Sequence, residues 1–371
     1  MKVLYIGYYK ENSDWGRITE SNILALDAAG VDVVCRSINL SQPRKISGRL
    51  AEIEQKDLSD CDFCIQHVFP DHLVGSKKFK KNVAILGNTF TEIGHTSVPE
   101  KLQQLDEVWV PNVNMARELS NLKVKARYIP FCTDTSKYKT KQKDIQIPQA
   151  VGKFKFYTML SPDDSKALES ILSAFNSEFD ASELATLIIF LVSPREDSNK
   201  KVRDISEAVK ASLHLQRDVS LYPREIIVGE PNLTQEQVYQ IHQYGDSYLD
   251  INSGHPWSSN LIDAVGFGSK PITTKWSAPK ELDDDDIAKT IDAVFKCKKS
   301  SGGHSSELEL GKDYFLSPCE KQIKEHMREA YEEWLSNPVV YTQKNKSKGY
   351  QKVEEFSLKN IGATMKEKLN D

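Results

Sequence analysis

The sequence alternates short runs of β-branched and aromatic residues with longer amphipathic stretches, and it does so twice along its 371 residues. Such alternation is typical of βαβ units, in which helices join parallel strands. In the first half the strand-like runs are residues 3–9, 31–35, 63–68, 83–87, 107–110 and 127–130. In the second half they are residues 154–160, 187–192, 226–228, 247–251 and 271–274. The sequence therefore predicts an α/β protein with two Rossmann-like parallel-sheet domains.

Helices are predicted between these strands and again after the last of them. The amphipathic stretches cover residues 17–29, 165–179, 202–215, 234–243, 258–265, 320–336 and 356–369. A polar segment, residues 137–153, separates the halves, and its Pro148 and Gly152 are typical of a linker. We therefore expect one domain over 1–146, a second over 147–340, and a C-terminal segment over 341–371. Two such halves imply a central cleft, a common place for ligands.

The composition is that of a globular protein, with 39% hydrophobic and 27% charged residues. The longest apolar run, residues 184–192, is far too short to span a bilayer. The first residues read as a strand and lack the features of a signal peptide, so we expect a cytoplasmic protein. Six cysteines in so long a chain do not make a disulfide framework. The CxxC pair Cys61 and Cys64 lacks a second ligand pair for zinc, and we interpret both as reduced thiols beside a strand.

Positive charge gathers in two places in a chain whose net charge is -4. The two clusters are Lys77, Lys78, Lys80 and Lys81, and then Lys137, Lys139, Lys141 and Lys143. Such clusters are usually solvated surface. A polyanionic acceptor such as modified DNA is the alternative that they leave open.

Four segments together resemble the retaining GT-B glycosyltransferases of the large "group 1" type, the family 4-like enzymes. The opening strand leads through Trp15-Gly16-Arg17 into a helix, where that family has a glycine loop. Residues 105–112 read LDEVWVPN, close to the family's D-E-V-W-V-P-S, and residues 126–134 follow like its v-P-x-G-v-D segment. Residues 166–175 read like K-g-x-x-x-L-x-A-F, and residues 254–268 stand where the family has Glu-x7-Glu. The resemblance implies a C-terminal helix that crosses back onto the first domain.

The resemblance also implies which residues of the second domain hold the donor. Lys166 would pair with the donor diphosphate, as a cation stabilises charge on a leaving group. Arg195 is the candidate for a second cation, because Ser161 stands where the family often has arginine. His255 and Asp263 occupy the positions of the two glutamates, which contact the sugar and the ribose. The backbone amides that open the following helix suit a diphosphate; they belong to Ser258, Ser259, Asn260 and Leu261.

In the first domain the candidates lie after the strands. Gly16 and Arg17 would approach the donor, since a glycine allows close backbone approach and a helix N-terminus attracts anions. His67 ends a predicted strand, and strand C-termini face the ligand in such folds. We name His67, Lys166 and His255 as catalytic candidates. Glu92 and His95, after the strand at 83–87, are candidates for the acceptor side.

The function that these motifs imply is transfer of a sugar from a nucleoside diphosphate sugar to a hydroxyl acceptor, with retention of configuration. We expect a UDP-sugar as donor substrate, a carbohydrate or other hydroxyl compound as acceptor, and no separate cofactor. No Asp-x-Asp motif is placed to bind a metal, so we expect a metal-independent reaction. The departures at His255 and Ser161 leave a second function open, a non-catalytic nucleotide-sugar-binding or scaffold protein. No G-x-G-x-x-G follows either opening strand, which argues against a nicotinamide dehydrogenase.

Overall fold

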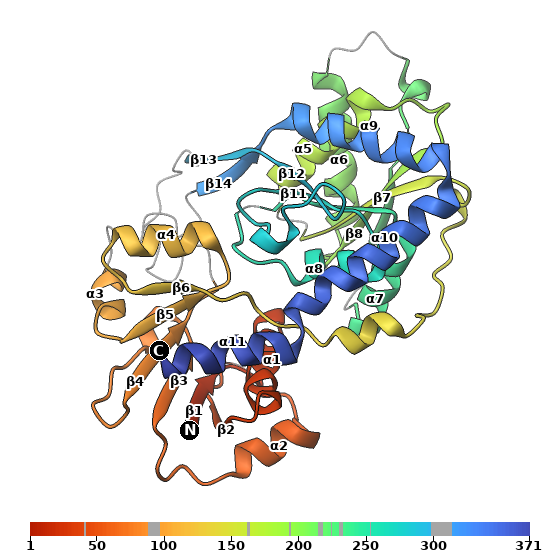
Figure 1. Cartoon of the computed structure of the whole chain (residues 1–371). Coiled ribbons are helices and arrows are strands. Elements are labelled where there is room, and N and C mark those ends of the chain that lie inside the picture. The colour runs from red at the N-terminus through yellow and green to blue at the C-terminus, as the bar shows by residue number, and fades with distance from the viewer. Residues whose placement is uncertain are drawn as a thin grey trace. The chain divides into compact units, whose positions relative to one another are not determined.

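The computed structural model describes residues 1–40, 42–87, 97–161, 164–192, 194–213, 218–223, 225–229, 233–252, 254–297 and 314–371. The chain divides into two compact units, coloured by residue number in Figure 1. Described residues of the first unit lie in Met1–Lys137 and Glu354–Asp371, and those of the second in Tyr138–Lys298 and Tyr314–Val353. Each unit is built on its own six-stranded sheet.

The first unit has a parallel sheet with the strand order β2-β1-β3-β4-β5-β6. Its strands are β1 (Lys2–Gly7), β2 (Asp32–Ser37), β3 (Phe63–His67), β4 (Lys81–Ile85), β5 (Glu107–Val110) and β6 (Ala126–Tyr128). Its helices are α1 (Asp14–Ala28), α2 (Gly48–Gln55), α3 (Val98–Leu102), α4 (Val113–Asn121) and α11 (Leu358–Asn370). Every strand predicted in this half is present. Helices α2, α3 and α4 were missed because five to nine residues show too little of a 3.6-residue period.

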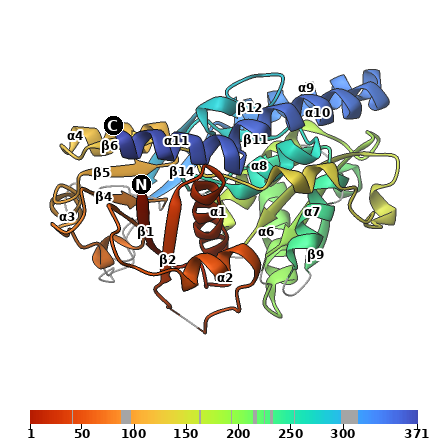
Figure 2. The same cartoon turned by 60° about the horizontal axis from the view of Figure 1, so that its bottom comes forward.

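The C-terminal helix α11 packs on α1, as the resemblance implied (Figure 2). Helix α1 begins at Asp14, where the Ser13 side chain accepts a hydrogen bond from the Gly16 amide and caps the helix. The two helices approach most closely at Gly362. A Cβ atom at that position would lie 2.0 Å from the carbonyl oxygen of Ala25. Only glycine therefore allows this packing of α11 on α1.

The second unit has a parallel sheet with the order β12-β11-β10-β7-β8-β9. Its strands are β7 (Phe154–Leu160), β8 (Ala185–Leu191), β9 (Ile226–Gly229), β10 (Ser247–Asp250), β11 (Ile272–Thr274) and β12 (Lys289–Ile291). Its helices are α5 (Ser165–Glu178), α6 (Ser198–Ser212), α7 (Gln235–Tyr244), α8 (Ser259–Phe267), α9 (Glu320–Ser336) and α10 (Pro338–Val353). A separate antiparallel pair, β13 (Ala293–Cys297) and β14 (Tyr314–Pro318), completes the unit.

Strand β7 shows why this sheet is buried on both faces. Phe154 and Phe156 enter one hydrophobic cluster with α5 and α9, whereas Tyr157 and Met159 enter a second cluster with α7. Successive side chains of a strand point to opposite faces, so each face carries its own core. Helices cover both faces of such a sheet, which leaves its strand ends to carry a binding site.

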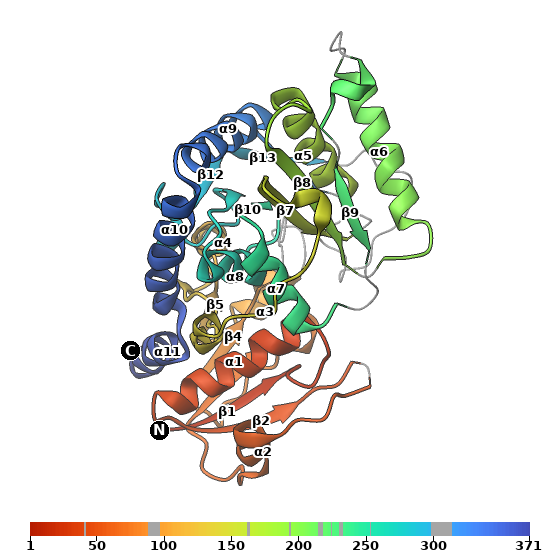
Figure 3. The same ribbon diagram turned by 90° about the vertical axis from the view of Figure 1, so that its right-hand side faces the viewer.

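Helix α10 was not predicted, and its sequence explains why. The buried positions are Tyr341, Asn345, Gly349 and Val353, a helical spacing that includes a polar residue and a glycine. This stripe faces α8, which lies beside α10 in Figure 3. A Cβ atom at Gly349 would lie 2.1 Å from the Val265 carbonyl oxygen. The helix is therefore stabilised by close packing that an apolar period does not reveal.

None of the helices in the described part of the chain combines the length and the apolar character that a membrane crossing requires.

Candidate functional site

Three of the predicted donor-side residues of the second unit follow three neighbouring strands. Lys166 lies in the first turn of α5, after β7; Arg195 follows β8; and His255 follows β10. In this sheet β10, β7 and β8 are adjacent and parallel. The carboxyl ends of parallel strands meet at one edge of a sheet, so the three residues share that edge. All three are exposed.

Lys166 and Arg195 supply the positive charge at this edge. The Lys166 Nζ atom lies 2.7 Å from Glu169 on the next turn of α5, and the lysine side chain is 57% exposed. An ion pair so exposed contributes little and leaves the lysine able to exchange partners. The backbone N–H of Arg195 donates to Ser198 Oγ (2.7 Å), which fixes the start of α6. Arg195 as a whole is exposed.

The Asn252 side chain holds the loop that carries His255 through hydrogen bonds. Its Oδ1 atom accepts hydrogen bonds from the backbone amides of Gly254 and His255, both at 2.8 Å. Its Nδ2 atom donates to Ser277 Oγ (3.0 Å). The indole of Trp276 donates to the Gly254 carbonyl oxygen (3.0 Å). These hydrogen bonds fix the backbone at Gly254 and His255.

Asp250, the last residue of β10, anchors the other end of the loop. Its carboxylate is 5% exposed and accepts hydrogen bonds from Ser258 Oγ (2.9 Å) and Thr273 Oγ1 (3.1 Å). Burial raises the pKa of Asp250, and these hydrogen bonds oppose the shift. Ser258 is also the N-cap of α8, because its Oγ accepts from the Leu261 amide (3.2 Å). The Asp250 carboxylate thus orients the residue that begins α8.

Two of the residues predicted in this segment have hydrogen-bond partners within the protein. Leu261 is one of the residues whose backbone amides were predicted to bind a diphosphate. Its amide donates to the Ser258 Oγ atom instead. Asp263 is 3% exposed and accepts a hydrogen bond from the Tyr138 hydroxyl group (2.7 Å). The Asp263 carboxylate is thus buried and hydrogen-bonded within the second unit. Ser259 and Asn260 occupy the first turn of α8, as predicted from the sequence.

The hydrogen bonds between Asn252 and the loop that carries His255 lead to a testable prediction. We expect Asn252→Ala to lower the free energy of unfolding by about 2 kcal/mol, because the backbone amides of Gly254 and His255 lose their hydrogen-bond acceptor. The same change should raise the hydrogen-exchange rates of the Gly254 and His255 amides. Chemical denaturation and hydrogen exchange measure the two effects. Asn370→Ala, at an exposed position, serves as control and should change neither; unchanged exchange at both amides in Asn252→Ala would refute the assigned role.

In the first unit the predicted residues follow the adjacent strands β1 and β3. Gly16 is buried in the first turn of α1, where a Cβ atom would lie 2.2 Å from the Glu11 carbonyl oxygen. Arg17 is exposed and pairs with Asp14 at 3.5 Å. His67 is the last residue of β3 and is fully buried. Glu92 and His95 lie outside the described residues.

His67 is enclosed by aromatic rings. The indole of Trp15 meets the imidazole edge-on at 4.4 Å between centroids, and the ring of Phe131 lies at 5.6 Å. The Tyr5 hydroxyl lies 2.9 Å from Nδ1. Burial lowers the pKa of His67 to about 3, so the imidazole is neutral at ordinary pH. Its Nε2 atom is buried and has no hydrogen-bond partner in the part of the chain that the structure describes.

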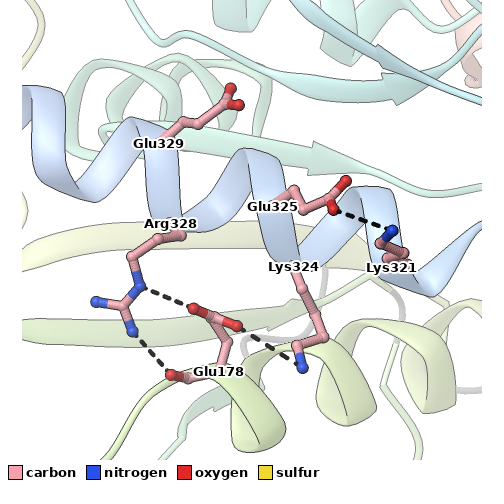
Figure 4. Close-up of a pocket in the computed structure, with 6 residues that line it drawn as sticks. All are labelled: Glu178, Lys321, Lys324, Glu325, Arg328 and Glu329. Atoms are coloured by element: carbon pink, nitrogen blue, oxygen red, sulfur yellow. Dashed lines mark hydrogen bonds and ion pairs between the residues drawn. The ribbon is translucent and has the colours of Figure 1, made fainter.

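A pocket of about 600 Å³ lies elsewhere in the second unit, between the end of α5 and α9 (Figure 4). Arg328 donates to the Glu178 carboxylate (2.8 Å), and Lys324 and Lys321 pair with Glu178 and Glu325. The charges that line this pocket therefore compensate one another. The pocket is at the C-terminal end of α5, whereas Lys166 is at its N-terminal end, so it does not include the donor-side candidates.

The sequence interpretation missed Asp250, Asn252 and Tyr5. Asp250 and Asn252 flank Ile251 at the end of a predicted strand, and polar residues at that point are a signal that could have been used. Tyr5 gave no such signal, because an aromatic residue within a strand reads as core. Among the described residues, no three His, Cys, Asp or Glu side chains are grouped so as to hold a metal ion. Cys61 and Cys64 are free thiols, as expected.

Comparison with known proteins shows the fold. No family model matches the chain, and no curated protein matches it. Among solved structures, a UDP-forming α,α-trehalose-phosphate synthase from Burkholderia xenovorans in complex with glucose-6-phosphate aligns over 100% of both chains, with a TM-score of 0.65 and 10% identity. An E. coli trehalose-6-phosphate structure bound with UDP-2-fluoro glucose aligns over 100% of this chain and 99% of its own, with a TM-score of 0.65 and 10% identity.

A third similar structure is the sucrose-phosphate synthase of Thermosynechococcus elongatus. It aligns over 100% of this chain and 98% of its own, with a TM-score of 0.59 and 11% identity. These are GT-B glycosyltransferases, and the similarity extends over both units. The chain therefore has the GT-B fold, as the sequence resemblance implied.

Proposed function

We propose that this protein is a retaining glycosyltransferase that moves a sugar from a UDP-sugar to a hydroxyl acceptor. The observation that carries the proposal is the shared edge of Lys166, Arg195 and His255, after three neighbouring strands of one parallel sheet. Two cations and an imidazole at that edge suit a diphosphate and a sugar. The similar structures from E. coli and Burkholderia xenovorans hold a UDP-sugar analogue and a sugar phosphate, compounds of the proposed classes.

In the proposed reaction the bond between the anomeric carbon and the diphosphate oxygen breaks. A bond from the same carbon to the acceptor oxygen forms, and the acceptor's proton leaves with the diphosphate. Lys166 and Arg195 would stabilise the negative charge that develops on the diphosphate. Two such cations can balance this charge without a metal ion. His255, on its fixed loop, would hydrogen-bond a sugar hydroxyl group or a phosphate oxygen.

A binding experiment with matched lysine variants tests this site. Saturating UDP-glucose, at 100 times its dissociation constant, should stabilise the native protein by roughly 2.7 kcal/mol. We expect Lys166→Ala to weaken UDP binding about tenfold, because a charge-assisted contact to phosphate is lost. Titration calorimetry with UDP and with UDP-glucose measures both.

Lys321→Ala is the matched control. Lys321 is an exposed lysine in the first turn of α9 and pairs with Glu325 one turn later, much as Lys166 pairs with Glu169. Its removal should leave the affinity for UDP unchanged. If the wild type, Lys166→Ala and Lys321→Ala bound UDP with equal affinity, Lys166 would be excluded from the donor site. Binding without any turnover would favour the alternative of a non-catalytic nucleotide-sugar-binding protein.

A further inference from the structure

Two aromatic side chains lie against the loop that carries His255. Trp276 follows β11, and Phe295 lies in β13; their rings meet edge-on with 4.8 Å between centroids. The indole Nε1 of Trp276 donates to the carbonyl oxygen of Gly254 (3.0 Å). Strands β10 and β11 are adjacent and parallel, so Trp276 belongs to the same carboxyl edge of the sheet as His255. Both aromatic residues are half-buried.

Gly254, the residue before His255, is contacted at each of its backbone groups. Its N–H donates to Asn252 Oδ1 (2.8 Å), and its carbonyl oxygen accepts from Trp276. Its Cα atom faces Phe295, since a Cβ atom at that position would lie 2.8 Å from the Phe295 Cε1 atom. Its φ angle of +112° lies in the region that favours glycine. The conformation of the peptide that leads into His255 therefore depends on Trp276 and on Phe295.

The ribbon formed by β13 and β14 brings Phe295 to this loop. The two strands form their own antiparallel pair, outside the six-stranded sheet, and Phe295 stands opposite Leu316 in its register (Figure 1). Leu316 is 4% exposed, and its Cβ atom would lie 3.7 Å from a Cβ atom at Gly254. The residue before Phe295, Val294, is 60% exposed, because successive side chains of a strand point to opposite faces. One face of the ribbon thus packs on the loop that carries His255.

We propose that Trp276 and Phe295 are positioning residues, which hold the loop that carries His255 in the conformation that binds the donor. The proposal rests on the proposed function, because that function places His255 at the donor. Neither aromatic residue needs to touch the ligand, since both act through the backbone of Gly254. The group that His255 recognises is an oxygen, either of a sugar hydroxyl group or of the diphosphate. UDP-glucose offers both kinds of oxygen next to the leaving group, whereas UDP lacks the hexose.

The positioning can be measured in the protein without a ligand. Trp276→Phe keeps an aromatic ring and removes the N–H group that donates to Gly254. We expect the backbone amides of Gly254 and His255 to exchange with solvent roughly tenfold faster in this variant, because the loop has lost one of its hydrogen bonds. Phe295→Ala removes the ring that lies against Gly254 and should have the same effect. It changes a half-buried residue outside the six-stranded sheet, so it tests the loop even if Trp276→Phe fails to fold.

Titration calorimetry then relates the loop to the donor. We expect Trp276→Phe and Phe295→Ala to bind UDP-glucose roughly fivefold to tenfold more weakly than the wild type, the effect of one misplaced hydrogen bond. If the affinity for UDP is unchanged, the loop serves a sugar hydroxyl group; if the affinity for UDP falls equally, it serves a diphosphate oxygen. A purely structural role would lower the fraction of protein that binds and leave the dissociation constant of that fraction unchanged.

Val294→Ala is the matched control, since it shortens a side chain on the opposite, exposed face of β13. It should change neither the amide exchange nor the affinities for UDP-glucose and UDP. Unchanged exchange rates or unchanged dissociation constants in both Trp276→Phe and Phe295→Ala would overturn the proposal and leave the proposed function standing. If the two amides exchange faster in both variants but the wild type binds no nucleotide sugar, the proposed function fails, and the aromatic pair still positions the loop.

Discussion

Gly362→Ala is expected to destabilise the protein, although alanine is the better helix former. In an isolated helix this change would stabilise by roughly 1 kcal/mol. Here the added Cβ atom would lie 2.0 Å from the Ala25 carbonyl oxygen and 2.6 Å from its carbon. Both are backbone atoms of α1, so no side chain can rotate away, and α11 must move off α1. We expect the free energy of unfolding to fall by roughly 3 kcal/mol, as for an overpacked core.

Denaturant unfolding measures this loss, and hydrogen exchange in α11 locates it. Lys359→Ala, at an exposed position of the same helix, is the control and should lie within about 0.5 kcal/mol of the wild type. A Gly362→Ala protein as stable as the wild type, with unchanged exchange in α11, would show that α11 does not pack on α1 as described.

Glu107→Gln should lower the free energy of unfolding by a similar amount, because it removes a buried negative charge. The Glu107 carboxylate is fully buried in β5 and contacts Arg127 (2.6 Å), Lys125 (3.1 Å) and Lys81 (3.2 Å). Trp109 Nε1 also donates to it (3.0 Å). The amide would leave three cations around a neutral group, and removing one partner of a buried ion pair costs roughly 3 kcal/mol. Denaturant titration at neutral pH measures the loss.

An exposed pair provides the comparison. Lys141 and Asp144 lie 3.6 Å apart with side chains 78% and 62% exposed, and Asp144→Asn should change stability by less than about 1 kcal/mol. If Glu107→Gln changed stability as little as Asp144→Asn, the Glu107 carboxylate would not hold β4, β5 and β6 together by charge.

We expect the Glu107 carboxylate to make the stability of the protein depend on pH. Burial acts to raise the pKa of Glu107, but hydrogen bonds from Trp109, Arg127, Lys125 and Lys81 outweigh it and hold the pKa at about 2. A carboxyl group with a lowered folded-state pKa stabilises the protein above its unfolded value, near 4.3, and loses that effect as pH falls toward 2. Glu107→Gln should therefore flatten the fall in stability across this range, measured by denaturant titration at several pH values.

Much of the architecture was predictable because strand signals are local. The runs at 154–160 and 107–110 coincide with β7 and β5, since β-branched and aromatic residues bounded by polar segments define strands. Helix α10 and the β13–β14 pair were not predictable. Gly349 and Asn345 in α10 are buried by close contact with α8, which depends on distant residues.

The candidate site was predictable at the level of segments and less so at the level of atoms. The segments with Lys166, Arg195 and His255 follow strands, and strand order then brings them to one edge. Asp263 stands at a motif position, yet its carboxylate points to Tyr138. Side-chain direction within a helix depends on where the helix begins, and Ser258 fixes that through Asp250, a contact the motif does not contain.

Sugar transfer itself is tested most directly by phosphorus NMR of UDP-glucose incubated with the protein and a set of hydroxyl acceptors that includes glucose 6-phosphate. We predict that the UDP-glucose signals are replaced by those of UDP, and that Lys166→Ala slows this replacement whereas Lys321→Ala does not. UDP-glucose and other UDP-sugars that remain intact with every acceptor, in protein shown to bind UDP, would contradict the assignment as a glycosyltransferase.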